Sequence, residues 1–197
     1  MLDGMHNELN RVGRKARYQS LEREGKSVIQ LSETSFQNYR GREDSVISDV
    51  FEGQFCSQIK CSQCGHESFS FDHFMDISVS FPPASKSAAL KDCLQQFIQP
   101  EQIQGYKCPK CQAKDKATKD ISIFRYPKVF VIHLKRFSIT GTSIHKLQTS
   151  LKIPQELDMQ PYGPHSEHES RMRASSYKLY GVVHHVGKHL DEGHYTC

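Results

Sequence analysis

Apolar and polar residues alternate through the middle of the chain as they do in half-buried strands. The alternation runs through Phe69–Phe71 and resumes over Ile77–Phe81, with a slip at Asp72–Met75 that predicts a bulge or a break. A nearly unbroken apolar run, Val129–Leu134, predicts a later strand that is covered on both faces. His133 lies inside that run and is interpreted as a core histidine whose ring nitrogens are satisfied. Strands are therefore expected to supply much of the core.

Three other segments place apolar residues at the spacing of a helix. The clearest is Leu90–Phe97, which follows the i, i+3, i+4, i+7 pattern and carries Cys93 on its apolar stripe. Leu2–Val12 and Val46–Phe51 show helical spacing as well. Residues 18–43 are polar and have no clear period, so a loop or a weak helix is expected there. Cys93 is interpreted as a core residue.

Composition and charge narrow the classes of function. The 197 residues suit one domain or a large part of one, and 11 Phe with 8 Tyr can fill a core. The formal charge of +4 at pH 7 is mild and spread along the chain, so nucleic acid is not expected as a partner. No stretch approaches the ~20 apolar residues of a membrane span, so no membrane partner is expected either.

The cysteines point to a metal. Seven cysteines, an odd number without a secretory context, favour reduced thiols over disulfides and hence the cytoplasm or the nucleus. Four of them form two Cys-x-x-Cys pairs that are separated by 43 residues. Two residues between thiolates let one tight turn present both sulfurs to one Zn²⁺, and a second such turn completes the tetrahedron. We predict a structural Zn²⁺ that joins two separate hairpins through the ligands Cys61, Cys64, Cys108 and Cys111.

Segments spread over nearly the whole chain resemble, in their order and spacing, the ubiquitin-specific cysteine proteases, also called ubiquitin carboxyl-terminal hydrolases. The segments are Leu2–His6, Phe51–Gln54, Cys61–Gly65, Leu90–Leu94, Tyr106–Cys111, Pro127–Phe137, Tyr177–Val183 and Gly193–Thr196. The resemblance implies an α+β fold of the papain-like thumb–palm–fingers type, present here in incomplete form. On this match residues 1–53 form part of the thumb and a connection, residues 54–123 form zinc-ribbon-type β fingers, and residues 124–197 form the palm with its histidine box.

The same resemblance implies an activity and its partners. The family cleaves the (iso)peptide bond after the C-terminal glycine of ubiquitin, so ubiquitin and ubiquitinated proteins are the expected partners. His194, in the Gly-His-Tyr box, matches the general base of the thiol protease. Three residues match contacts to the ubiquitin tail: Asp3 faces its basic part, Phe137 lies beside its leucines, and Tyr195 lies near its last glycines.

The nucleophile of the family does not match any residue of this chain. In the family it lies in an Asn-Thr-Cys segment upstream, and the third triad member, an Asp or Asn, lies downstream of the histidine. Four cysteines match the metal ligands, Cys93 lies on a core helix, and Cys56 has no helix N-terminus to activate it. Cys197 follows His194 at a position that is usually small in the family. We therefore expect a catalytic domain cut at both ends and inactive alone.

Two other interpretations compete with a truncated enzyme. One is a non-catalytic ubiquitin-binding pseudo-deubiquitinase, against which the retained His194 argues, because a protein without catalysis has no chemical need for that base. The other is a zinc protein that binds nucleic acid through the basic run Arg11–Arg17. That run lacks interleaved aromatic residues and a recognition-helix pattern, so it is interpreted as a solvated helix end.

Overall fold

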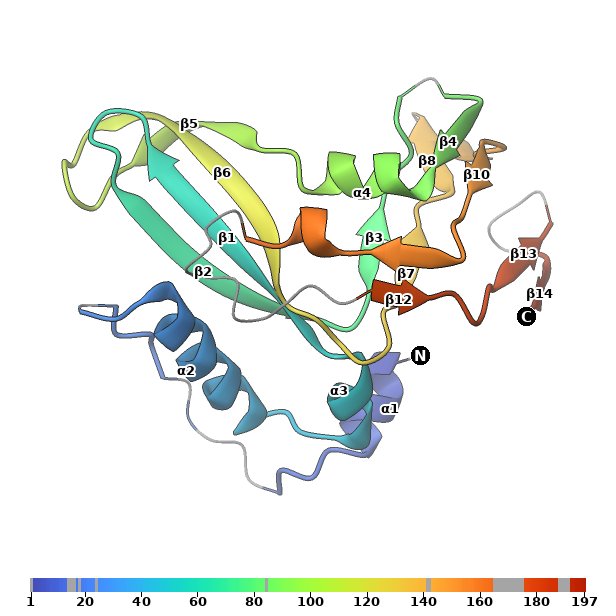
Figure 1. Ribbon diagram of the computed structural model, residues 1–197, viewed down its shortest axis with the longest axis horizontal. Coiled ribbons are helices and arrows are strands. Elements are labelled where there is room, and N and C mark those ends of the chain that lie inside the picture. The colour runs from blue at the N-terminus through green and yellow to red at the C-terminus, as the bar shows by residue number, and fades with distance from the viewer. Residues whose placement is uncertain are drawn as a thin grey trace.

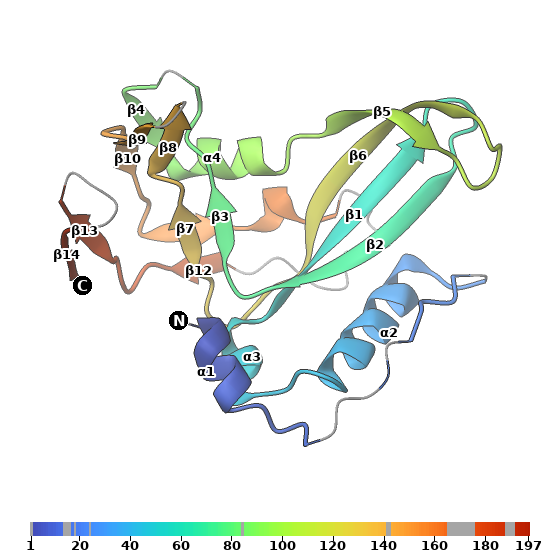
Figure 2. The same ribbon diagram turned by 180° about the vertical axis from the view of Figure 1, so that it is seen from behind.

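Helices and strands are mixed along the chain (Figures 1 and 2). The computed structural model describes all residues except 1, 14–16, 18, 24, 84, 141–142, 165–175 and 188–191. The described helices are α1 (Leu2–Glu8), α2 (Val28–Arg40), α3 (Val46–Phe51), α4 (Leu90–Phe97) and the 3-10 helix η1 (Gln160–Tyr162). The described strands are β1 (Gly53–Cys61), β2 (Glu67–Phe74), β3 (Ile77–Val79), β4 (Ser87–Ala89), β5 (Glu101–Lys107), β6 (Lys114–Arg125), β7 (Ile132–Leu134), β8 (Phe137–Thr140), β9 (Ser143–Lys146), β10 (Ser150–Lys152), β11 (Glu156–Asp158), β12 (Ser176–Lys178), β13 (His184–Val186) and β14 (His194–Thr196). None of the described helices is both long and apolar enough to cross a membrane.

A four-stranded antiparallel sheet forms an arm that projects from the rest of the molecule (Figure 1). Its strand order is β2-β1-β6-β5, so two hairpins, β1–β2 and β5–β6, are joined through β1 and β6. The register of the first hairpin runs without a shift from Gly53↔Phe74 to Lys60↔Glu67. Alternation at Phe69–Phe71 therefore predicted a strand correctly. The slip predicted at Asp72–Met75 is not a bulge, because β2 stays paired to Phe74, and the strand breaks at Met75 and Asp76, before β3.

The largest core cluster packs α4 against β3 and the base of β6. Leu94 and Ile77 are each 1% exposed, and Cys93 is fully buried. Burial raises the pKa of the Cys93 thiol, which keeps the thiol protonated and unreactive. The sequence prediction that Cys93 lies in the core is confirmed. Met159, before η1, closes the cluster with no exposed surface.

Helix α2 lies within residues 18–43, and the expectation of a loop or weak helix is wrong for this part. A capping box begins the helix: the Gln30 amide donates to Ser27 Oγ at 3.3 Å, and the Ser27 amide donates to Gln30 Oε1 at 2.9 Å. Its buried residues are Leu31 and Ser32. Leu31 packs in a cluster with Phe71, while Ser32 Oγ donates to Gln54 Oε1 at 2.6 Å. The helix is stabilised by these contacts with the sheet and not by a wide apolar stripe.

Two other elements differ from their predicted form. Helix α1 ends at Glu8 and buries His6, whereas Leu9 on the predicted apolar face is 50% exposed. The reason is that His6 Nδ1 lies 2.7 Å from the buried Ser45 Oγ, a partner that local periodicity does not reveal.

Strand β7 has three residues, is paired only with β3 among the described strands, and is half-buried. His133 within it is exposed, with Nδ1 3.0 Å from Ser78 Oγ, so its assignment to the core was wrong.

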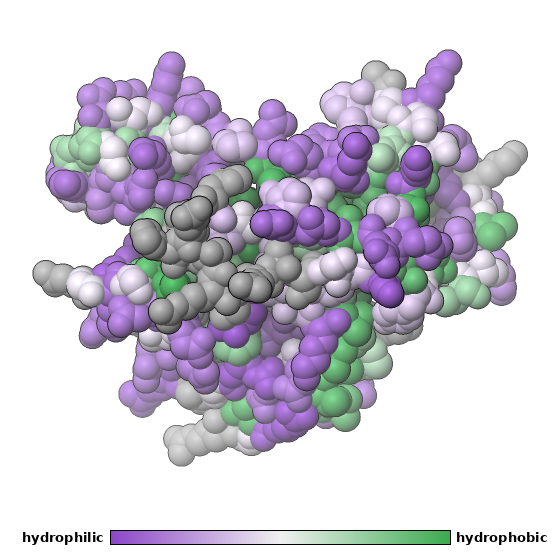
Figure 3. Space-filling model, viewed as in Figure 1, coloured by the Kyte–Doolittle hydropathy of each residue, from purple (hydrophilic) through white to green (hydrophobic). Residues whose placement is uncertain are grey.

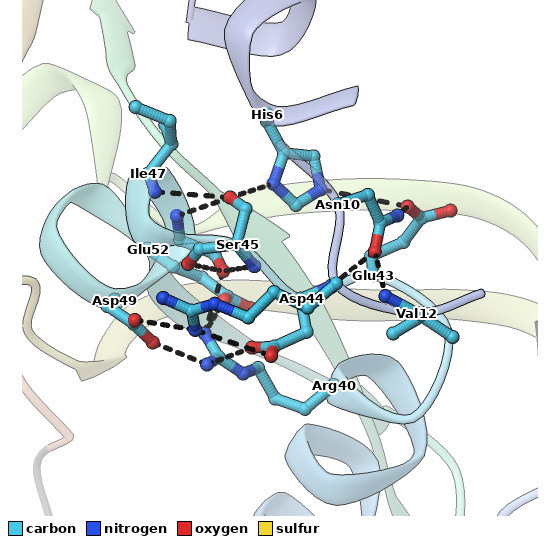
Figure 4. A network of polar contacts seen from close by, with 12 residues as sticks. His6, Asn10, Val12, Arg40, Glu43, Asp44, Ser45, Ile47, Asp49 and Glu52 are labelled. Atoms are coloured by element: carbon cyan, nitrogen blue, oxygen red, sulfur yellow. Dashed lines mark hydrogen bonds and ion pairs between the residues drawn. The ribbon is translucent and has the colours of Figure 1, made fainter. Parts of the chain in front are cut away.

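A polar network ties α2 to the start of β1 (Figure 4). Arg40, at the end of α2, donates to Ser48 Oγ at 2.7 Å, to Asp49 Oδ1 at 2.5 Å and to Glu52 Oε2 at 3.4 Å, and it also contacts Asp44. The Glu52 side chain is 1% exposed. A carboxylate this deeply buried needs charged partners, and Arg40 is one of them.

Replacement of Arg40 tests this network. Arg40→Met is expected to lower the free energy of unfolding in urea by about 3 kcal/mol, because it leaves the buried Glu52 carboxylate with fewer cationic partners. Lys60→Met is the control, since Lys60 Nζ contacts Glu67 at 3.0 Å in an exposed pair. That change is expected to cost less than about 1 kcal/mol. Equal losses in the two variants would contradict the burial argument.

Exposed apolar side chains gather at the end of the molecule that lies away from the tip of the arm (Figure 3). They come from α1 and the residue after it, from α3, and from the segment around β13 and β14. The large ones are Met5, Leu9, Val46, Leu179, Tyr180, Val183, Val186 and Tyr195. Several large exposed apolar side chains at one end of a molecule are typical of a surface that meets another molecule or another part of a protein.

Candidate functional site

The two Cys-x-x-Cys turns meet at the tip of the arm. Cys61 Sγ lies 3.9 Å from Cys111 Sγ, and Cys64 Sγ lies 3.6 Å from Cys108 Sγ. All four sulfurs lie within 4.8 Å of one another. A tetrahedral Zn²⁺ with Zn–S bonds of about 2.3 Å separates its sulfurs by about 3.8 Å. The four thiols therefore fit the metal that their spacing predicted, and they come from the two hairpins as expected.

The backbone repeats itself in the two turns. Gly65 donates its amide to Cys61 O at 3.0 Å, and Gln112 donates its amide to Cys108 O, also at 3.0 Å. Gly65 and Gln112 both follow the second cysteine of their pair and both have positive φ, 66° and 59°. Glycine adopts this conformation freely, while Gln112 adopts it at a cost of roughly 1 kcal/mol. Because the two turns have the same geometry, each directs its two sulfurs toward the same position between the turns.

The pKa values of the second turn show how crowded the sulfurs are. The Cys111 amide, followed by that of Lys110, stabilises the Cys108 thiolate and lowers its pKa to about 7. The Ala113 amide acts in the same direction on Cys111, but burial and hydrogen bonds from Cys64 and Cys108 prevail and raise the Cys111 pKa to about 11. Four thiolates in one place repel one another, and a bound cation is what lets all of them ionise.

A second group of predicted residues meets at the hairpin of β13 and β14. The register pairs Val186 with His194 and His185 with Tyr195. The His185 ring lies 4.9 Å from the Tyr195 ring and 5.8 Å from the Phe137 ring, measured between centroids. The structure thus brings Phe137 and Tyr195 together around His185. His194 immediately precedes Tyr195 in β14, so its side chain lies on the opposite face of the hairpin. His194 and Tyr195 are both exposed.

Asp3 lies on a different element. It is exposed in the first turn of α1. Figures 1 and 2 show α1 and the β13–β14 hairpin away from the tip of the arm, in the half of the molecule that holds α4. Hairpin β8–β9 carries Phe137 at its start, and its residues 141–142, like residues 188–191 between β13 and β14, lie outside the described part.

The sequence did not indicate the contacts of one residue in this region, Lys146. Lys146, at the end of β9, donates from Nζ to His185 O and Gly187 O, each at 2.7 Å, and to His185 Nδ1 at 3.0 Å. These partners lie 39 and 41 residues further along the chain. A lysine in a polar hairpin is typically a solvated side chain, so only the tertiary structure reveals the contact.

Comparisons with known proteins agree on one family. The profile described as ubiquitin carboxyl-terminal hydrolase matches residues 1–197. Ubiquitin carboxyl-terminal hydrolase 2 of Gallus gallus is 35% identical over 202 residues, which cover 100% of this chain and 55% of the relative. Usp2 of Drosophila melanogaster is 36% identical over 202 residues, which cover 100% of this chain and 20% of the relative. The chain thus spans about half, or less, of the length of these relatives.

Solved structures agree on the fold. A SAGA DUB module of Ubp8, Sgf11, Sus1 and Sgf73 bound to monoubiquitin gives a TM-score of 0.67 at 29% identity, covering 84% of this chain and 37% of that chain. The same module bound to ubiquitin aldehyde gives 0.68 at 28% identity, covering 85% and 38%. The predicted α+β architecture of this family's catalytic domain is confirmed, with a cluster of four cysteines in a zinc-ribbon-like arm. The chain belongs to the ubiquitin carboxyl-terminal hydrolase family.

Proposed function

We propose that this chain is the part of a deubiquitinase catalytic domain that carries the general base. It also carries the walls of the tail channel, the passage that admits the C-terminal tail of ubiquitin. In this proposal residues 1–53 belong to the thumb and its connection, residues 54–123 to the fingers, and residues 124–197 to the palm. The reaction is hydrolysis of the (iso)peptide bond after the C-terminal glycine of ubiquitin. The observation that carries the proposal is the group of rings of Phe137, His185 and Tyr195, which gathers at the same short hairpin that exposes His194.

The geometry supports a role for each side chain. His194 takes the proton of a cysteine thiol, the thiolate attacks the carbonyl carbon, and the C–N bond breaks as His194 donates the proton to the leaving lysine amine. His194 then takes a proton from water, which hydrolyses the thioester and releases ubiquitin and the thiol. Phe137 and Tyr195 form walls that admit a slim Gly-Gly end and exclude bulkier side chains. Asp3 pairs with the basic residues of the ubiquitin tail. Zn²⁺, when bound by the four cysteines, holds the two finger hairpins together and takes no part in the reaction.

The thiol in this proposal comes from outside these 197 residues. Cys56 and Cys93 are buried, and four cysteines form the metal cluster. Cys197 is exposed, but it lies directly after β14 (His194–Thr196) and does not begin a helix that could activate its thiol. The 197-residue chain alone is therefore expected to bind ubiquitin without hydrolysing it.

Binding to ubiquitin tests the tail channel apart from catalysis. Tyr195→Ala is expected to weaken the binding of ubiquitin by about 10-fold in calorimetric titrations, because it removes a wall of the channel. Lys152→Ala is the control: Lys152 is exposed on β10 and lies outside both the aromatic group and the exposed apolar surface, so the Kd is expected to stay within about 2-fold.

The outcomes separate the candidate functions. Binding that is lost when the tail of ubiquitin is removed supports the channel, and binding that is indifferent to the tail and to Tyr195 contradicts it. If the full-length protein binds ubiquitin through the tail and does not hydrolyse it, the protein is a pseudo-deubiquitinase. Retention on DNA at moderate salt, without affinity for ubiquitin, would support binding to nucleic acid instead.

A further inference from the structure

We propose that Lys146 is a positioning residue for the reaction, which holds the short β13–β14 hairpin in the conformation that presents His194. The inference rests on the proposed function, because it assumes that His194 is the base. The hairpin pairs only three residues on each strand. An isolated two-stranded hairpin is marginally stable in water, so contacts from elsewhere in the chain must fix it.

Lys146 supplies such a contact with all of its donors. The ammonium group has three protons, and three acceptors lie within hydrogen-bond distance: His185 O, Gly187 O and His185 Nδ1. Lys146 is half-buried, and its strand partner across hairpin β8–β9 is Phe137. A charged donor to carbonyls in a half-buried place forms stronger hydrogen bonds than a neutral one. The end of β9 is therefore joined to the middle of β13 and to Gly187, the residue that follows β13.

The contact continues through His185 to the residue before His194. An ammonium group only donates, so His185 Nδ1 accepts and the ring proton lies on Nε2. The Nε2 side of the ring lies directly against Gly193, where a Cβ would come 2.3 Å from Nε2. Gly193 has φ +150°, a value that side chains disfavour, so the close approach and the backbone both require glycine.

Gly187, the residue directly after β13, packs closely, as Gly193 does. Gly187, whose carbonyl Lys146 binds, has φ +153°, and a Cβ there would lie 2.8 Å from Glu192 O. Both glycines therefore bring the two strands together at the point where Lys146 is attached. Phe137 and Tyr195 pack on the same His185 ring. Lys146 thus links the walls of the tail channel to the strand that carries His194.

The test uses steady-state turnover of a fluorogenic ubiquitin C-terminal amide by the full-length protein. Lys146→Met keeps the length of the side chain and removes its donors, and it is expected to lower kcat by about 10- to 100-fold, the range caused by small displacements of a catalytic group. KM is expected to change less than kcat. Lys146→Arg keeps a cationic donor and is expected to recover part of the loss. Lys152→Met, at an exposed lysine of β10, is expected to leave both constants within about 2-fold.

Three results would decide the inference. Unchanged kcat in Lys146→Met, in a protein that His194→Ala inactivates, overturns the role of Lys146 and leaves the proposed function intact. Unchanged turnover in His194→Ala overturns the proposed function itself. If Lys146→Met fails to fold, nitrogen NMR of the unaltered protein decides: a His185 ring with its proton on Nε2 supports the contact, and a proton on Nδ1 overturns it.

Discussion

His194→Ala is expected to lower kcat for a fluorogenic ubiquitin substrate by about 10⁴-fold or more in the full-length protein, the size of loss seen when a catalytic triad loses its base. The expectation follows from the exposure of His194 on β14, the strand whose next residue, Tyr195, joins the rings of Phe137 and His185. Without the imidazole the thiol is left mostly protonated and the leaving amine has no acid. Affinity for ubiquitin is expected to persist, since the walls of the channel remain.

The neighbouring histidine provides a matched control. His184 lies on the paired strand β13, opposite Thr196, and is exposed as His194 is. His184→Ala removes an imidazole from the same hairpin, yet it is expected to change kcat by no more than a few fold, because this ring contributes no proposed step. Comparable losses in the two variants would show that the hairpin, and not the base, had been damaged. Full activity in His194→Ala would refute the assignment of the base.

Removal of the metal is expected to disorder the tip of the arm. The protein should contain one Zn²⁺ per chain, and chelation should lower the melting temperature and accelerate hydrogen exchange in the turns of hairpins β1–β2 and β5–β6. In small zinc domains the binding free energy is about 10–16 kcal/mol and is used for folding. Here the β1–β6 pairing remains, so the loss is expected to be confined to the hairpin ends.

Single cysteine variants refine this test. Cys64→Ser removes one of four clustered thiols and is expected to abolish stoichiometric Zn²⁺ binding, measured by metal analysis after dialysis. Cys197→Ser changes an exposed cysteine outside the cluster and is expected to retain one Zn²⁺. A protein that is well folded and metal-free in its unaltered form, with unchanged exchange at both turns, would refute a structural role for zinc.

Local patterns predicted the features that depend on neighbours in sequence. The spacing of each Cys-x-x-Cys pair determines one turn, so the metal cluster could be inferred although its halves lie far apart. The period of Leu90–Phe97 likewise predicted α4 and the buried Cys93. The capping box of Ser27 and Gln30 was a readable signal for α2, but the polar composition of residues 18–43 concealed it.

Features that depend on distant partners were not predictable in this way. His6 is buried because Ser45 meets it from 39 residues away, and Lys146 is bound because two carbonyls, at the middle of β13 and just after it, face its ammonium group. The positive φ of Gln112 is imposed by the cluster, while the glycine at position 65 indicates the same conformation from sequence alone. In each case the deciding energy comes from tertiary contact, which outweighs local preference.

The uninterrupted pairing of β1 with β2 fixes the length of the arm, and with it the distance from the Arg40 network to the metal cluster. The nine residues of β1 rise about 3.3 Å each, so the strand sets a separation of roughly 30 Å between the Arg40 network and the metal cluster. Lengthening both hairpins by two residues per strand would move the sulfurs outward by about 7 Å and keep every side chain on its face. Lengthening each strand by one residue would move the side chains beyond the insertion to the opposite face of the sheet. A change of one residue would therefore need a β-bulge, such as the register shift between Gln54 and Phe55 in the pairing of β1 with β6.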